Sequence, residues 1–352
     1  MENKTTSSPV KNILTIVISL AFAGFFLWLA LRGLDFEVIK GALAKANYSW
    51  VLLAAVFGLG AYWFRAVRWN LLLEPMGHKI SNSNSLWSIS FGYLMNLTIP
   101  RSGELARATA LYGVEKVPVD KSFGTIILER VIDLVCMLVF LGLTLIFKYD
   151  VIFSFYKLAT TQKKEEKVTE PNWFENILLS IGISDFGQFY FVLKIGLLVL
   201  VGIAILYLVI FKRKKLIDFA KGILAGLLSI FKLEQKGKFF LLTVLIWVCY
   251  YFAAYLVCFS LPETSDFGFA DGFYLLVVGT LGMIIPASGG IGAFNLAMKF
   301  GFMALFISMG KDATLGGEIG LIYSFISLPL QICLMLVMGL ISIPMLAKAR
   351  KF

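Results

Sequence analysis

Long apolar stretches separated by short polar connections dominate the pattern of the chain. A helix that crosses the hydrocarbon core of a bilayer needs about 20 mostly apolar residues. Six runs approach or exceed this length: 13–31, 48–64, 122–147, 189–211, 239–261 and 320–346. We therefore predict an all-α polytopic membrane protein with about six full transmembrane helices.

Two other apolar segments, 87–100 and 273–286, are shorter and end in a shared string, Ile-Pro-x-Ser-Gly, at 99–103 and 285–289. Proline removes a backbone donor and glycine frees the turn, so each string should end one half-helix and start another. This predicts two re-entrant helical hairpins, 84–112 and 272–310. The residues expected to break them are Pro100, Ser102 and Gly103 in the first, and Pro286, Ser288, Gly289, Gly290 and Gly292 in the second.

The two hairpins are expected to open on opposite sides of the membrane. Counting crossings along the chain gives this inverted arrangement, which is typical of secondary transporters with paired broken helices. Irregular backbone at membrane depth persists only where it lines a protein-enclosed or watery cavity. The alternative, in which these segments cross fully and give about eight spans, stays open.

The chain is interpreted as a single integral membrane domain, 1–352, built from two halves. The first half covers 1–147, the second covers 189–352, and 148–188 is predicted to be an extracytoplasmic loop. Within the second half, apolar residues recur at three- and four-residue steps over 212–238, which predicts a basic amphipathic helix on the cytoplasmic surface. The residues expected to contact the anionic inner leaflet are Lys212, Arg213, Lys214 and Lys215.

Composition agrees with lipid as the main solvent: 59% of the 352 residues are hydrophobic and 15% are charged, with a mean hydropathy of +0.84. Much of the net charge of +10 lies in 212–238 and the C-terminal tail. By the positive-inside rule we expect a multi-pass protein of the inner (plasma) membrane with both termini cytoplasmic. One histidine and no Cys-x-x-Cys pair disfavour the common zinc sites. No metal or cofactor is expected.

Charged residues inside apolar segments cost about 2.5–3.5 kcal/mol each on the insertion scale, so they indicate function. They concentrate in the first half, and together with one asparagine they form the predicted headgroup-binding set: Arg65, Arg68, Asn96, Arg101, Glu104, Arg107, Glu129, Arg130 and Asp133. Five arginines against three carboxylates favour an anionic or zwitterionic group such as a lipid phosphate. For any single residue, an internal ion pair that only joins helices is an equally good interpretation.

These residues resemble a known family in type, order and spacing. The motifs are Arg65-x-x-Arg68-Trp69, Asn96-x-x-x-Pro100-Arg101-x-Gly103-Glu104-x-x-Arg107, Glu129-Arg130-x-x-Asp133 and Pro286-x-x-Gly289-Gly290-x-Gly292. They look like the lysylphosphatidylglycerol synthase transmembrane-region family, also called the flippase-like domain family. It is similar to the flippase half of the multiple peptide resistance factor and to archaeal proteins of dolichol-linked glycosylation. The resemblance covers roughly residues 10–345.

The resemblance implies a membrane protein that moves a lipid or a lipid-linked group between leaflets. The sequence departs from the family in two respects, which limit what the resemblance implies for this chain. The synthases have a soluble aminoacyltransferase domain after the membrane part, and this sequence shows none, so we expect no enzyme activity of that kind. The family often has a glutamate three residues after the late Gly-x-Gly unit, where this chain has Asn295.

The sequence therefore predicts a lipid translocase for an anionic or zwitterionic phospholipid or a polyprenyl-linked lipid. The alternative from a different class is an intramembrane transferase that modifies a polyprenyl phosphate or a phospholipid. The expected partners are membrane lipids and the anionic inner-leaflet surface, with no nucleic acid. A homo-oligomer is compatible with the sequence.

Overall fold

The computed structural model describes residues 40–41, 44–99, 101–164, 221, 224, 228–284 and 290–350, and all statements below refer to these. This part is helical and contains no strand. Four helices are long and apolar enough to cross a membrane: α3 (Tyr48–Leu73, extended by a 3₁₀ turn to Met76), α6 (Val119–Phe147), α11 (Lys236–Cys258) and α14 (Ala313–Ala349). The predicted all-α polytopic membrane fold is confirmed. The predicted spans 13–31 and 189–211 lie outside the described residues.

Two pairs of short helices occur where the sequence predicts hairpins. The first pair is α4 (Asn82–Thr98) and α5 (Gly103–Glu115), and the second is α12 (Phe269–Ile284) and α13 (Ala293–Ser308). Their lengths of 17, 13, 16 and 16 residues correspond to about 20–26 Å, less than the ~30 Å hydrocarbon core. Half-helices of this length fit re-entrant hairpins better than full spans.

The turn of the first hairpin is held by side chains that bond its backbone. The amide of Gly103, at the start of α5, donates to Asn96 Oδ1 at 2.7 Å, and Ser102 Oγ donates to the carbonyl of Ile99 at 2.7 Å. Arg101 adopts a left-handed backbone with φ of 64°, as do Gly290 and Gly292 beside the second break. Pro100, Pro286, Ser288 and Gly289 lie outside the described residues.

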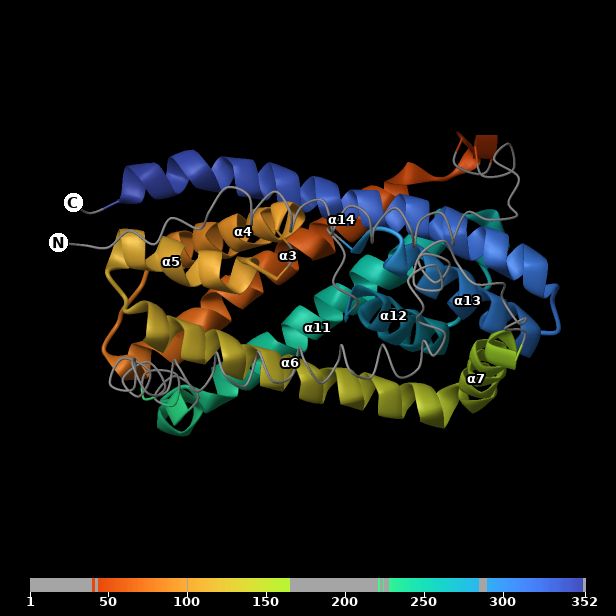
Figure 1. The fold of residues 1–352 in the computed structure, drawn as a ribbon, viewed down its shortest axis with the longest axis horizontal. Coiled ribbons are helices and arrows are strands. Elements are labelled where there is room, and N and C mark those ends of the chain that lie inside the picture. Colours follow the sequence, from red (N-terminus) through yellow and green to blue (C-terminus); the bar gives the residue numbers. More distant parts are fainter. Residues whose placement is uncertain are drawn as a thin grey trace, which may run out of the picture.

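The helices of the two halves interleave (Figure 1). α3 packs along α11, and the two run in opposite directions through the middle of the molecule. The hairpins lie toward opposite ends of the long axis. Each also packs on the last long helix of the other half, because α4 contacts α14 and α12 contacts α6. This reciprocal packing is the arrangement expected of two inverted halves.

Two segments differ from the sequence prediction. The first part of the predicted loop 148–188 is a helix, α7 (Tyr149–Lys164), because Val151, Ile152 and Phe155 pack into the same apolar core as α12 and α13. The predicted helix 212–238 is not continuous over its described residues. A 3₁₀ turn (Leu228–Lys232) precedes α11, since buried Leu233 turns the chain against α3.

Close approach of α4 and α5 requires glycine at their contact. A Cβ on Gly103 would lie 2.5 Å from Asn96 Nδ2, and a Cβ on Gly92 would lie 2.7 Å from the carbonyl oxygen of Gly103. Real Cβ atoms do not approach this closely. The hairpin therefore depends on two glycines facing each other.

Gly103→Ala is expected to lower the free energy of unfolding by about 1–3 kcal/mol, the usual cost of overpacking. Gly113→Ala, on the same helix, is the matched control, since its Cβ would meet nothing within 4 Å. Thermal unfolding of the purified variants, followed by tryptophan fluorescence, measures the difference. Equal melting temperatures for both variants would contradict the packing described.

Candidate functional site

A network of buried charges joins three helices of the first half. α3 supplies Arg65 and Arg68, which lie on one face because they are three residues apart. α6 supplies Glu129 and Asp133, stacked one turn apart, and α5 supplies Arg107. Arg68 and Glu129 are each 0% exposed. A charge buried to this extent is stable only when an opposite charge lies next to it.

Three guanidinium groups share two carboxylates in this network. Arg68 Nη2 lies 3.0 Å from Asp133 Oδ1 and 3.5 Å from Glu129 Oε1. The other oxygen of each carboxylate takes a further arginine: Arg65 Nη2 lies 2.9 Å from Asp133 Oδ2, and Arg107 Nη1 lies 2.7 Å from Glu129 Oε2. Among the described residues, one positive charge of the network has no counter-charge.

The second half of the chain also contributes to the network, through α11. Tyr250 Oη accepts a hydrogen bond from Arg65 Nη2 at 2.9 Å, and Thr243 Oγ1 accepts one from Arg68 Nη1 at 3.3 Å. Sequence reasoning missed both residues. Their signal was present, since two polar side chains seven residues apart share one face of an otherwise apolar span. The network therefore binds the two halves together.

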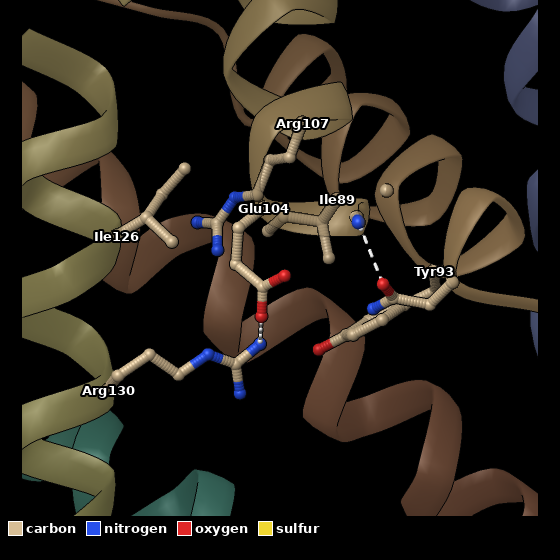
Figure 2. Close-up of a pocket in the computed structure, with 9 residues that line it drawn as sticks. Ile89, Tyr93, Glu104, Arg107, Ile126 and Arg130 are labelled. Atoms are coloured by element: carbon tan, nitrogen blue, oxygen red, sulfur yellow. Dashed lines mark hydrogen bonds and ion pairs between the residues drawn. The ribbon is translucent and has the colours of Figure 1, made fainter. Parts of the chain in front are cut away.

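A small cavity lies beside Arg107, between α4, α5 and α6 (Figure 2). Its volume is about 10 Å³, which is room for about one water molecule. The guanidinium carbon of Arg107 stacks 3.6 Å from the ring centre of Trp69. Arg107 is 5% exposed, and its Nε and Nη2 find no hydrogen-bond partner among the described residues. Buried donors of a cation without partners favour an anion at this place.

An ion pair stands at the mouth of this cavity. Arg130 Nη2 lies 2.8 Å from Glu104 Oε1, and both side chains point toward the space that Arg107 also faces. Arg130 is 49% exposed and Glu104 is 24% exposed. The neighbouring surface of α6 is apolar, with Val131 and Leu134 exposed. Arg130 is the twelfth residue of a span that begins at Val119, and charges within an apolar span are costly, so this pair is a candidate for a functional role.

The other predicted site residues are placed as follows. Asn96 lines the cavity and holds the amide of Gly103. Arg101 lies apart from the network, because its Nη2 donates to the carbonyl of Ile284 at the C-terminal end of α12. A cation at a helix C-terminus is favourable, so Arg101 links the tips of the two hairpins. Lys212, Arg213, Lys214 and Lys215 lie outside the described residues.

Asn295, which stands where the resembling family often has glutamate, is buried in the second hairpin. Its Oδ1 accepts from the amide of Gly292 at 3.0 Å and its Nδ2 donates to Ser324 Oγ at 2.7 Å. It thus fixes the turn before α13. Within the described residues, no group of three or more histidine, cysteine or acidic side chains is arranged to hold a metal ion.

Removal of one charge tests the network. Glu129→Gln leaves Arg68 and Arg107 underpaired and is expected to lower the free energy of unfolding by about 3–5 kcal/mol, the cost of breaking a buried ion pair. Adding Arg107→Met returns the network to the wild-type excess of one positive charge, so the double variant should be more stable than Glu129→Gln alone. Melting temperatures of the two variants and the wild type measure this coupling. Additive losses would show that the pair is not coupled.

Comparisons with known proteins identify the family of the chain. The sequence model of the "Lysylphosphatidylglycerol synthase TM region" family matches residues 16–334. A UPF0104 membrane protein of Methanocaldococcus jannaschii is 28% identical over 143 residues, which are 40% of this chain and 40% of that protein. No solved structure matches significantly. The chain is a multi-pass membrane protein and belongs to the lysylphosphatidylglycerol synthase transmembrane-region family.

Proposed function

We propose that the protein is a lipid translocase of the inner (plasma) membrane. Its substrate is an anionic or zwitterionic phospholipid or a polyprenyl-linked lipid. The observation that carries the proposal is that Nε and Nη2 of buried Arg107 have no hydrogen-bond partner among the described residues, next to a cavity whose mouth is a partly exposed ion pair. Membership of a family named for a lipid synthase's membrane region supports a lipid substrate.

The chemistry of the site suits a phosphate. A guanidinium group presents a planar fork of N–H donors that matches two phosphate oxygens. The single uncompensated positive charge of the network balances one phosphodiester charge. Glu104 would release Arg130 to the phosphate as the headgroup passes, or would itself hold a cationic part of a zwitterionic headgroup. The apolar face of α6 keeps the acyl chains in lipid.

Translocation requires the cavity to open, because about 10 Å³ admits no headgroup. The Arg130–Glu104 pair joins α6 to α5, so separating these helices breaks that pair and widens the mouth. Arg101 connects the first hairpin to the end of α12 in the second. A movement of one hairpin is therefore passed to the other, as in alternating-access transporters with paired broken helices.

Transport in proteoliposomes tests the proposal. Fluorescent phosphatidylglycerol in the outer leaflet is quenched by dithionite, and the wild type should expose inner-leaflet lipid at a measurable rate. Arg107→Gln is expected to slow this exchange about tenfold or more, since a hydrogen bond to a charged group contributes about 1.5–3 kcal/mol. Arg107→Lys keeps the positive charge but lacks the paired N–H donors of a guanidinium group. Its exchange rate should therefore lie between those of the wild type and Arg107→Gln.

Lys116→Gln, at an exposed position that caps α5, is the control and should transport at the wild-type rate. Melting temperatures show whether Arg107→Gln is folded. Chromatography of the recovered lipid separates translocation from the enzymatic alternative, because a translocase returns the lipid unchanged. Wild-type exchange by folded Arg107→Gln would refute the site, and a converted lipid would favour the transferase.

A further inference from the structure

A second cavity, here called the end bay, lies where α3 ends. It is formed by the C-terminal part of α3, the turn before α4 and the start of α11. Its volume is about 270 Å³, far larger than the cavity beside Arg107, and the two share no lining residue. An apolar cluster with Leu72, Phe239 and Leu242 packs between α3, α6 and α11. The end bay is therefore a separate feature from the arginine network.

The end bay carries an excess of positive charge. Lys79 and Lys238 lie at its rim, are exposed, and have no ion-pair partner within the described residues. Glu74 is the acidic residue of the lining. Burial and nearby Lys121 lower the pKa of His78, so this imidazole is neutral at pH 7 and the lining holds a net charge of one positive unit.

Hydrogen bonds hold the shape of the end bay before any ligand arrives. Asn70 Nδ2 donates to the carbonyl of Ile80 at 3.2 Å and to Asn82 Oδ1 at 2.6 Å. Asn70 Oδ1 in turn accepts from Ser85 Oγ. These bonds fix the turn before α4 against α3. A preformed site avoids the entropic cost of ordering on binding.

The position and the lining favour an amphiphile over a free ion. The end bay lies at the C-terminal end of α3 and the N-terminal end of α11, and both of these helices are long enough to cross a membrane. The ends of membrane-spanning helices lie at the level of the lipid headgroups. Beside the charged rim, Val67, Leu71 and Ile80 give the bay an apolar wall. Two lysines with an apolar wall match a phosphodiester attached to a glycerol and its chains.

We propose that the end bay binds the phosphodiester headgroup of an anionic phospholipid. Lys79 and Lys238 contact the phosphate, Asn82 Nδ2 donates to it, and the apolar wall receives the glycerol and the first methylenes. This lipid is held at the surface and does not pass through the arginine network. The site is thus an accessory lipid site, whose occupancy does not depend on the proposed translocation.

Binding of dihexanoyl phosphatidylglycerol to the purified protein in neutral detergent tests the proposal. The Arg107→Gln variant serves as the background for every comparison, so that the cavity beside Arg107 does not contribute. Each lysine near an anionic headgroup contributes about fivefold in affinity. Lys79→Gln with Lys238→Gln should therefore weaken binding about 25-fold, and Lys79→Arg with Lys238→Arg should restore it.

The matched control is Lys116→Gln with Lys348→Gln, which removes the same charge from exposed positions outside the bay and should leave binding unchanged. Dihexanoyl phosphatidylcholine and inorganic phosphate should both bind at least tenfold more weakly. Equal losses in the bay variant and the control would overturn the proposal, because surface charge alone would then explain binding. Inorganic phosphate binding as tightly as phosphatidylglycerol would overturn the assignment to a lipid.

Discussion

The rest of the structure depends on one constraint: the buried arginines outnumber the buried carboxylates that pair with them. Arg65, Arg68 and Arg107 share Glu129 and Asp133, and none of these groups could remain charged in lipid without the others. The pairs fix α3, α5 and α6 relative to one another, and bonds to α11 tie in the second half. Within the part of the chain that the structure describes, the same pairing leaves two donors of Arg107, Nε and Nη2, without a hydrogen-bond partner. One imbalance thus underlies both the stability of the helix packing and the proposed binding of an anion.

The hairpins place this imbalance next to the small cavity that is the proposed headgroup site. Because α5 starts at the break of the first hairpin, its first two turns bring Glu104 and Arg107 to positions that a continuous membrane helix would fill with apolar side chains. Glu104 meets Arg130 on the apolar face of α6, which places a partly exposed ion pair beside the buried network. Figure 1 shows the hairpins toward opposite ends of the molecule, and Arg101 joins their tips.

The features that can be predicted from the sequence are those set by residues close together in the chain. Bilayer thickness sets the minimum apolar length by which α3, α6, α11 and α14 are recognised as spans, and proline with glycine marks both breaks. Three- and four-residue spacing places Arg65 with Arg68 and Glu129 with Asp133. What the sequence could not predict depends on contacts distant in the chain: the bonds of Thr243 and Tyr250, the direction of Arg101, and helix α7, whose apolar side chains pack mainly against α13.

An experimental structure in lipid nanodiscs rich in phosphatidylglycerol tests the central claim most directly. A headgroup phosphate is expected between α5 and α6, with an oxygen within about 3 Å of Arg107 Nη2 and the Arg130–Glu104 pair separated. The claim would be contradicted if the Nε and Nη2 atoms of Arg107 were both bonded to protein groups while lipids were confined to the outer surface of the helices.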